Sequence, residues 1–154
     1  MSGEEIVAAL QATFGTAVVR VPAATPDLVL EVPREMVAQV AAHLKTAPGL
    51  EFDYLIFVTA VDRVDYLEVV YGLRSLKHRH QLLMKARVPA SEPEIPTVTG
   101  IWPAANWDER ETYDLFGVRF TGHPNLTRIL LPDNWEGHPL RKDYPLTGRP
   151  PRVF

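Results

Sequence analysis

Hydrophobic and polar positions in the first third of the chain predict two amphipathic helices. Ser2 and Glu5 stand at the spacing of a capping box, and Gly15 is a natural helix stop. Between them, apolar residues recur at helical spacing, at Ile6, Leu10 and Phe14. A second helix is expected to start at Pro33 and to stop at Pro48-Gly49. Its apolar stripe comprises Met36, Val37, Val40, Ala41 and Leu44.

The residues between these two helices, and those after the second helix, have a pattern typical of strands. Two short strands and three longer ones are predicted, at 16–21, 28–32, 52–61, 66–73 and 79–88. The run 52–61 is almost continuously apolar, which favours a central strand that is covered on both faces. The polar residues 62–65 indicate a hairpin between 52–61 and 66–73. Along 79–88 every second residue is apolar, so we expect a sheet with one face packed by helices and one largely wet face.

A proline-rich segment, 89–96, divides the chain into two parts. We expect an α+β core domain over 1–96 and, continuous with it, a motif-bearing helix and docking tail over 97–154. The helix should be capped by Asn106 and end at Gly117, with an acidic first half. After Phe120 neither periodicity lasts long. The predicted fold class is therefore α+β, with a mixed or antiparallel sheet and helices on one face, followed by an acidic helix and an extended Pro-rich C-terminal segment.

Composition narrows the chemistry that this chain can perform. It has no cysteine, which excludes thiolate metal sites, Cys-ligated iron–sulfur clusters and cysteine nucleophiles. With 16 basic and 19 acidic residues the net charge is −3, so no global field favours nucleic acid. The first residues are acidic rather than basic, and no apolar run reaches the roughly 18 residues needed to cross a bilayer. We expect no direct membrane insertion and a cytoplasmic protein, attached to a membrane through a partner if at all.

Residues 108–145 are dense in Trp, Arg, His, Gly, Pro and carboxylates, without a nucleophile beside a base. That mixture predicts docking, because Trp, Tyr and Arg carry most interface energy. We expect no catalytic, cofactor-binding or metal-ligating residue in the chain. The predicted partner-contacting residues are Glu109, Arg110, Glu111, Asp114, His123, Arg128, Trp135, His138, Arg141, Lys142, Asp143 and Tyr144.

Local roles can be predicted for several of these side chains. Arg110 and Asp114 are four apart on the expected helix and should form an ion pair. His123 and His138 each stand between glycine and proline, which favours a turn-forming or interface-bonding imidazole over a general base. A metal held by the helix carboxylates is disfavoured, because no histidine lies within the helix. The aromatic residues expected to form local core are Trp107, Phe116 and Phe120.

The same segment resembles a known family. The runs 109–120, 122–124 and 135–145, with 55–62 and 67–75 upstream, are similar to the signature of the 30 kDa (C) subunit of respiratory complex I, the proton-pumping NADH:quinone oxidoreductase. One departure is Thr127-Arg128, where many relatives read Arg-Arg. The resemblance implies a cofactor-free peripheral subunit that lies against the quinone-site subunit (49 kDa, or D) and a neighbouring iron–sulfur subunit. FMN, iron–sulfur clusters, NADH and quinone would belong to partner subunits, on the cytoplasmic side of the cell inner membrane.

Two alternatives to this function remain at this point. A related subunit in a membrane-bound hydrogenase or a ferredoxin-linked oxidoreductase would share the motifs, and would be distinguished by the large subunit that co-purifies. A stand-alone enzyme would use Glu109, Glu111 and His123 as an acid/base set. This last interpretation requires a closed pocket around those three groups.

Overall fold

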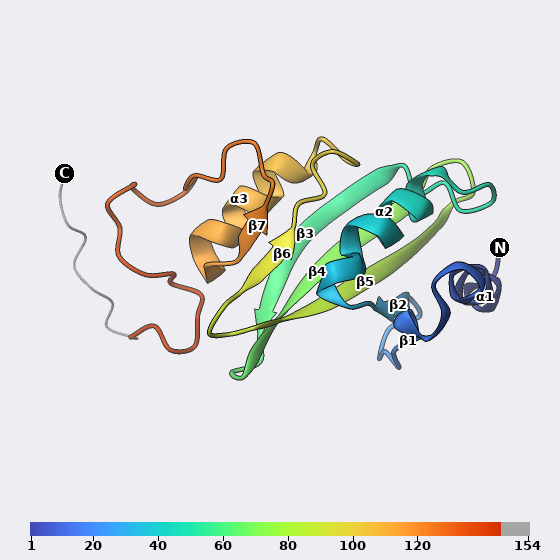
Figure 1. Ribbon diagram of the computed structural model, residues 1–154, viewed down its shortest axis with the longest axis horizontal. Coiled ribbons are helices and arrows are strands. Elements are labelled where there is room, and N and C mark those ends of the chain that lie inside the picture. Colours follow the sequence, from blue (N-terminus) through green and yellow to red (C-terminus); the bar gives the residue numbers. More distant parts are fainter. Residues whose placement is uncertain (146–154) are drawn as a thin grey trace.

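A twisted five-stranded sheet organises the computed structural model, which describes residues 1–145 (Figure 1). Its strands lie in the order β1-β2-β5-β4-β3. They are β1 (Val19–Arg20), β2 (Leu28–Glu31), β3 (Tyr54–Asp62), β4 (Tyr66–Ser75) and β5 (His80–Pro89). β2 runs parallel to β5, whereas all the other neighbouring pairs are antiparallel. The sheet is therefore mixed, and the predicted α+β class is confirmed.

Three α-helices accompany the sheet. They are α1 (Gly3–Phe14), α2 (Val37–Thr46) and α3 (Ala105–Phe116), with 3₁₀ turns η1 (Gly15–Ala17) and η2 (Arg34–Met36). Two short strands, β6 (Glu94–Pro96) and β7 (Arg119–Thr121), form a separate parallel pair. In Figure 1, α2 lies across the long strands and α1 lies near β1, at one end of the molecule. α3 lies toward the other end, beside the C-terminal segment. The regular elements thus end with β7, and residues 122–145 contain neither helix nor strand.

The first two helices form where the pattern predicts them. Ser2 Oγ accepts a hydrogen bond from the Glu5 N–H at 3.2 Å, and Glu5 Oε2 accepts one from the Ser2 N–H at 3.0 Å, which completes the capping box. Gly15 then ends the helix with φ +64°, a conformation that glycine adopts without a Cβ penalty. The second helix begins one turn later than expected, because the residues after Pro33 first form the 3₁₀ turn η2.

One hydrophobic core joins both parts of the chain. The α2 stripe packs with the inward face of β5, where Leu82, Met84, Ala86 and Val88 are buried. The same cluster continues past the proline-rich segment through Ile95, Val98, Trp102, Ala105, Val118 and Phe120. Burying each large apolar side chain contributes about 1.5–3 kcal/mol. Residues 97–121 are therefore built into the core rather than attached to it, and the segment 89–96 itself contributes β6.

The run 52–61 does not form a central strand as predicted, because β3 is an edge strand. Leu55, Val58 and Ala60 face the core, whereas Tyr54 and Ile56 are exposed. The central place next to β5 belongs to β4. The outer edge of β3 is covered by α3: Thr112 Oγ1 donates to the Val58 carbonyl at 3.2 Å, and the Asp108 carboxylate accepts from the Val58 N–H. A helix-covered edge is as apolar as a central strand, which explains the misassignment.

Three further local predictions need correction. The strand expected over 16–21 is reduced to Val19–Arg20 by the turn η1. The α3 cap is Ala104, which makes no side-chain hydrogen bond, and Asn106 lies inside the helix. Trp107 is 61% exposed rather than core, while Phe116 packs partly against the core and Phe120 is buried, as expected. Of the predicted C-terminal segment, residues 146–154 lie outside the described residues.

Candidate functional site

The motif-rich segment folds around one buried carboxylate on α3. Asp114 is fully buried, and its Oδ1 accepts a hydrogen bond from Arg128 Nη1 at 2.7 Å. Its Oδ2 accepts from three successive backbone N–H groups, at 3.2, 2.8 and 3.0 Å, those of Ile129, Leu130 and Leu131. Arg128 in turn donates to the carbonyls of Trp135 and Gly137 at 3.1 and 2.9 Å. We call Asp114, Arg128 and the backbone groups that they bind the tail clamp.

The tail clamp keeps Asp114 ionised although it is buried. Burial by itself would raise the pKa of this carboxyl, but the Arg128 guanidinium and the three backbone N–H groups bind the charged form and lower the pKa below its usual value. The predicted Arg110–Asp114 ion pair is wrong. Arg110 donates instead to the carbonyl and the hydroxyl of Thr127, at 3.1 and 3.0 Å. It also lies over the ring of Trp107, at 4.9 Å from the ring centroid.

A second anchor ties the end of the described tail to the sheet. Arg141 donates to the Ala90 carbonyl at 2.9 Å, and the Lys142 N–H donates to Asp62 Oδ2 at 2.8 Å. Arg141 Nε also lies 4.0 Å from Asp62 Oδ2. Burial raises the pKa of Asp62, but hydrogen bonds from the N–H groups of Lys142 and Val64, and the Arg141 charge, give a net lowering. The tail is thus fastened to the end of β3 as well as to α3.

Both tail histidines shape the backbone. His123 Nδ1 accepts from the Asn125 N–H at 2.9 Å, so its Nε2 carries the proton and donates to the Asn106 carbonyl at 3.2 Å. His138 Nδ1 lies 3.0 Å from the Asp114 carbonyl, and its ring lies against Gly117. Burial first, and then the neighbouring arginines, lower the pKa of His138. The turn-forming role predicted for the imidazoles is confirmed for His123.

Glu109 is fully buried and faces the loop before α3 rather than solvent. Its carboxylate accepts hydrogen bonds from the Thr97 hydroxyl and from the Val98 N–H, the latter at 2.8 Å. Burial raises the pKa of Glu109 to about 7, although both hydrogen bonds oppose the rise. Glu111, two residues further along α3, is exposed. The structure therefore does not bring Glu109, Glu111 and His123 into one acid/base pocket.

The predicted contact residues divide into an inner and an outer group. Glu109, Asp114, Arg128 and Arg141 bind groups of their own chain, so any part they play in docking would be indirect. Trp135 and Tyr144 are half-buried, and Trp135 Nε1 and Tyr144 Oη are buried without a hydrogen-bond partner among the described residues. The exposed group comprises Glu111, Lys142 and Asp143. The partner contacts predicted for all twelve residues stay a prediction.

Sequence reasoning missed the groups that receive these side chains. Asp62 anchors the tail from the end of β3, and Thr97 holds Glu109 from a loop twelve residues away. Asp62 has a sequence signal, since a carboxylate directly after an apolar strand stands at a sheet end, where a loop can return to it. Thr97 has none, because nothing in the residue pattern brings the loop against α3.

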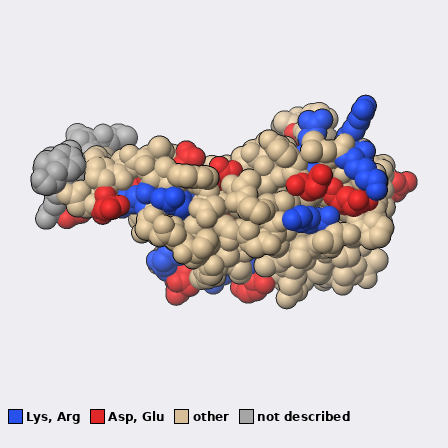
Figure 2. Space-filling view, turned by 90° about the horizontal axis from the view of Figure 1, so that it is seen from above, with Lys and Arg blue, Asp and Glu red and all other residues tan. Residues whose placement is uncertain are grey.

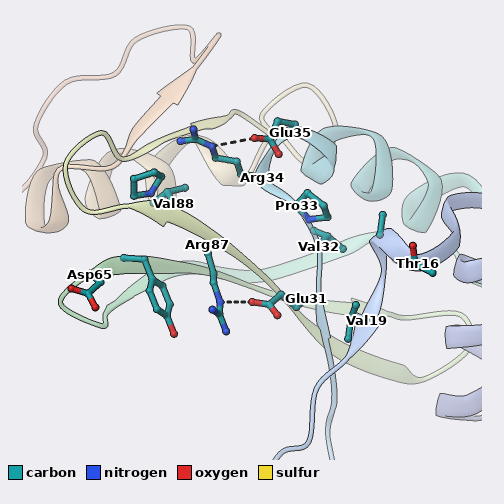
Figure 3. Close-up of a pocket in the computed structure, with 13 residues that line it drawn as sticks. Thr16, Val19, Glu31, Val32, Pro33, Arg34, Glu35, Asp65, Arg87 and Val88 are labelled. Carbon is teal, nitrogen blue, oxygen red and sulfur yellow. Dashed lines mark hydrogen bonds and ion pairs between the residues drawn. The ribbon is translucent and has the colours of Figure 1, made fainter.

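A cavity among the described residues lies away from the motif segment. It measures about 680 Å³ and is formed by η1, the ends of β2 and β5, η2 and the β3–β4 hairpin (Figure 3). Its charged side chains are already paired, Glu31 with Arg87 at 2.6 Å and Arg34 with Glu35 at 3.4 Å. Its floor is formed by apolar residues such as Val32 and Val88. The predicted site residues all lie elsewhere.

Three further properties of the described residues concern charge, metal ligands and helix length. Figure 2 shows acidic and basic side chains interspersed near both ends of the molecule, with a wide central area that has neither kind. Within residues 1–145, no group of three or more His, Asp or Glu side chains is placed to hold a metal ion. None of the helices over the same residues is long and apolar enough to cross a membrane.

Known proteins share both the sequence and the fold. The NADH-quinone oxidoreductase subunit designated C in Salinispora tropica is 46% identical over 141 residues, which cover 89% of this chain and 58% of that protein. The same subunit of Roseiflexus castenholzii is 44% identical over 144 residues, covering 92% and 83%. The chain thus spans somewhat over half the length of the Salinispora relative.

Two solved structures have the same architecture. A trypsin-resistant fragment of Nqo5 aligns with a TM-score of 0.68 and 31% identity, over 80% of this chain and 98% of the fragment. A chain of the membrane-bound sulfane sulfur reductase, an archaeal respiratory membrane complex, aligns with a TM-score of 0.79 and 28% identity, over 94% and 86%. The family described as respiratory-chain NADH dehydrogenase, 30 Kd subunit, matches residues 30–150. Sequence, fold and the motif-bearing tail agree, and this chain belongs to the 30 kDa subunit family of respiratory-chain NADH dehydrogenases.

Proposed function

We propose that this chain is the 30 kDa (C) subunit of an NADH:quinone oxidoreductase and serves as a scaffold for the subunit that forms the quinone site (49 kDa, or D). The relatives from Salinispora and Roseiflexus are named as NADH-quinone oxidoreductase subunits with the letter C. The chain itself performs no redox step in this proposal. It contributes to electron transfer from NADH to quinone by holding neighbouring subunits in place.

The observation that carries the proposal is that some side chains of the motif segment bind their own chain, whereas large apolar side chains of the same segment stay exposed. Asp114, Arg128 and Arg141 bind groups of the same chain and give the tail one shape. Three large apolar side chains of α3 and the tail stay in solvent: Trp107, Leu130 and Leu140 are 61%, 60% and 52% exposed. A surface that presents an exposed tryptophan and two exposed leucines fits protein docking, since large side chains of this kind anchor interfaces.

Cofactors and location follow from the same proposal. With no cysteine, the chain cannot supply thiolates to an iron–sulfur cluster. FMN, the iron–sulfur clusters, NADH and quinone would be bound by partner subunits, one of which is the neighbouring iron–sulfur subunit. The chain would be held peripherally on the cytoplasmic side of the cell inner membrane by those partners.

A second candidate has a specific observation in its favour. The sulfane sulfur reductase chain, at 28% identity, matches a larger share of this chain than the Nqo5 fragment does. The same fold is therefore present in respiratory assemblies with another name, and a related subunit of a membrane-bound hydrogenase or ferredoxin-linked oxidoreductase is the alternative.

The experiment is a mild-detergent purification of the tagged full chain from native membranes, with mass spectrometry and activity measurements. Recovery of the quinone-site and iron–sulfur subunits, with inhibitor-sensitive NADH:quinone activity, is expected. Recovery of a nickel-bearing large subunit or a sulfur reductase would replace the proposal with the alternative. Recovery of the folded chain without any partner subunit would contradict both the proposal and the alternative.

A further inference from the structure

A groove runs between β3 and α3. It measures about 320 Å³. Its walls are largely apolar and are formed by Phe57 from β3, Leu115 and Phe116 from α3, and Leu140 from the tail. Asp108 and Glu111 also line it. The groove thus combines an apolar floor with carboxylates from a single helix.

Neither carboxylate has a cation within the described residues. Asp108 accepts a hydrogen bond from the Val58 N–H, yet its partial burial raises its pKa. Glu111 has no hydrogen-bond or ion-pair partner within residues 1–145. The two are three positions apart on α3, so their side chains are neighbours on the helix surface. The two carboxylates place negative charge together at one end of the apolar groove, and one positive group lying between them would interact with both.

Further apolar side chains are exposed on β3, in the turn that follows it and in the tail. Ile56, Val61 and Val64 are 42%, 37% and 66% exposed, and Leu140 is 52% exposed. An edge strand normally carries charged residues toward solvent, because exposed apolar strands aggregate. The exposed apolar positions on β3 therefore indicate a surface that another chain covers.

We propose that this groove docks an arginine-bearing apolar segment of a partner subunit. The guanidinium would lie between Asp108 and Glu111, and the neighbouring apolar side chains would cover Phe57, Leu115 and Leu140. Arginine suits the place better than lysine, since its planar fork can bind two carboxylates at once and can lie flat against aromatic rings. The inference rests on the proposed function, because it places the occupant in the same complex.

The test combines site-specific cross-linking with charge reversal in the full tagged chain, expressed in cells that assemble the complex. The photoreactive amino acid p-benzoylphenylalanine replaces Thr59, which is exposed and lines the groove, or Gln39, an exposed control on α2. We expect Thr59 to cross-link to one apolar segment that contains an arginine, and Gln39 not to reach that segment. Cross-linking of Thr59 to a second copy of this chain, to lipid or to a segment without arginine would overturn the proposal.

Charge reversal supplies the second readout. Glu111→Arg should reduce co-purification of the partner about tenfold or more, as for a lost buried charge pair, and Glu111→Gln should reduce it less. Glu4→Arg on the distant helix α1 is the matched control and should not change recovery. Changing the cross-linked partner arginine to glutamate should restore binding of Glu111→Arg. Unchanged thermal melting of both variants would exclude unfolding as the cause.

Failure of this inference can be told apart from failure of the proposed function. If the wild-type chain recovers the oxidoreductase subunits and Glu111→Arg recovers them equally well, the docking groove is wrong and the subunit role stands. If the wild-type chain recovers none of those subunits, the proposed function is wrong, and the groove inference is overturned with it.

Discussion

Glu109→Gln should make the stability of this protein less dependent on pH. The buried Glu109 carboxyl has its pKa raised from 4.5 to about 7, so the folded state holds its proton more tightly than the unfolded state does. The stabilisation by this group is complete below pH 4.5, declines as the pH rises to 7 and is gone above that. At 1.36 kcal/mol per pH unit, the rise in pKa corresponds to roughly 3 kcal/mol.

The assay is urea unfolding of the full chain from pH 4.5 to pH 8.5. Between these limits the wild-type protein should lose up to roughly 3 kcal/mol more stability than Glu109→Gln, because glutamine occupies the same site without a charge to bury. Glu111→Gln, on the exposed side of the same helix, is the matched control and should follow the wild type. The pKa values of Asp62 and Asp114 are lowered, so these groups change the stability only at acidic pH, and they are present in all three proteins. Equal pH dependence of the wild type and Glu109→Gln would refute the reasoning.

Three more substitutions test the tail and the sheet. Asp114→Ala leaves Arg128 buried without its partner, which typically costs about 3–5 kcal/mol, and should speed proteolysis within 122–145 before the core melts. Gly117→Ala meets both a φ of +80° and the His138 ring, 2.6 Å from the new Cβ, so it should lower the melting temperature more than Gly15→Ala, whose Cβ meets nothing within 4 Å. Gly72→Ala brings a Cβ within 2.5 Å of the Phe57 ring and should cost about 1–3 kcal/mol in chemical denaturation, partly recovered by adding Phe57→Leu. Equal melting of the two glycine variants, intact tails in Asp114→Ala, or a neutral Gly72→Ala would each contradict its prediction.

The sequence predicted those features whose physical cause is local. The capping box of α1, its stop at Gly15 and the alternation along β5 depend on residues within a few positions of each other, and all are present. Place in the sheet is different, because periodicity cannot distinguish a central strand from an edge covered by a helix. The run that forms β3 is an edge strand whose outer edge is covered by α3.

The candidate site shows the same limit. The residue types of the motif segment indicated docking, but not which side chains face inward. The i, i+4 rule paired Arg110 with Asp114, whereas Asp114 binds Arg128, fourteen positions away, where a guanidinium and three N–H groups converge on it. Local rules rank only the partners within one helix. A carboxylate that the fold buries takes whichever donors the returning chain provides.

The covering of β3 by α3 also has a consequence during synthesis. β3 and β4 leave the ribosome well before residues 105–116, and until those residues pack, the outer backbone edge around Val58 has neither the Thr112 hydroxyl nor the Asp108 carboxylate to bind. An open apolar edge is a template for strand pairing between chains. A nascent chain that stops before α3 should therefore be prone to aggregation. Once α3 packs against β3, this edge is no longer open to pairing with another chain.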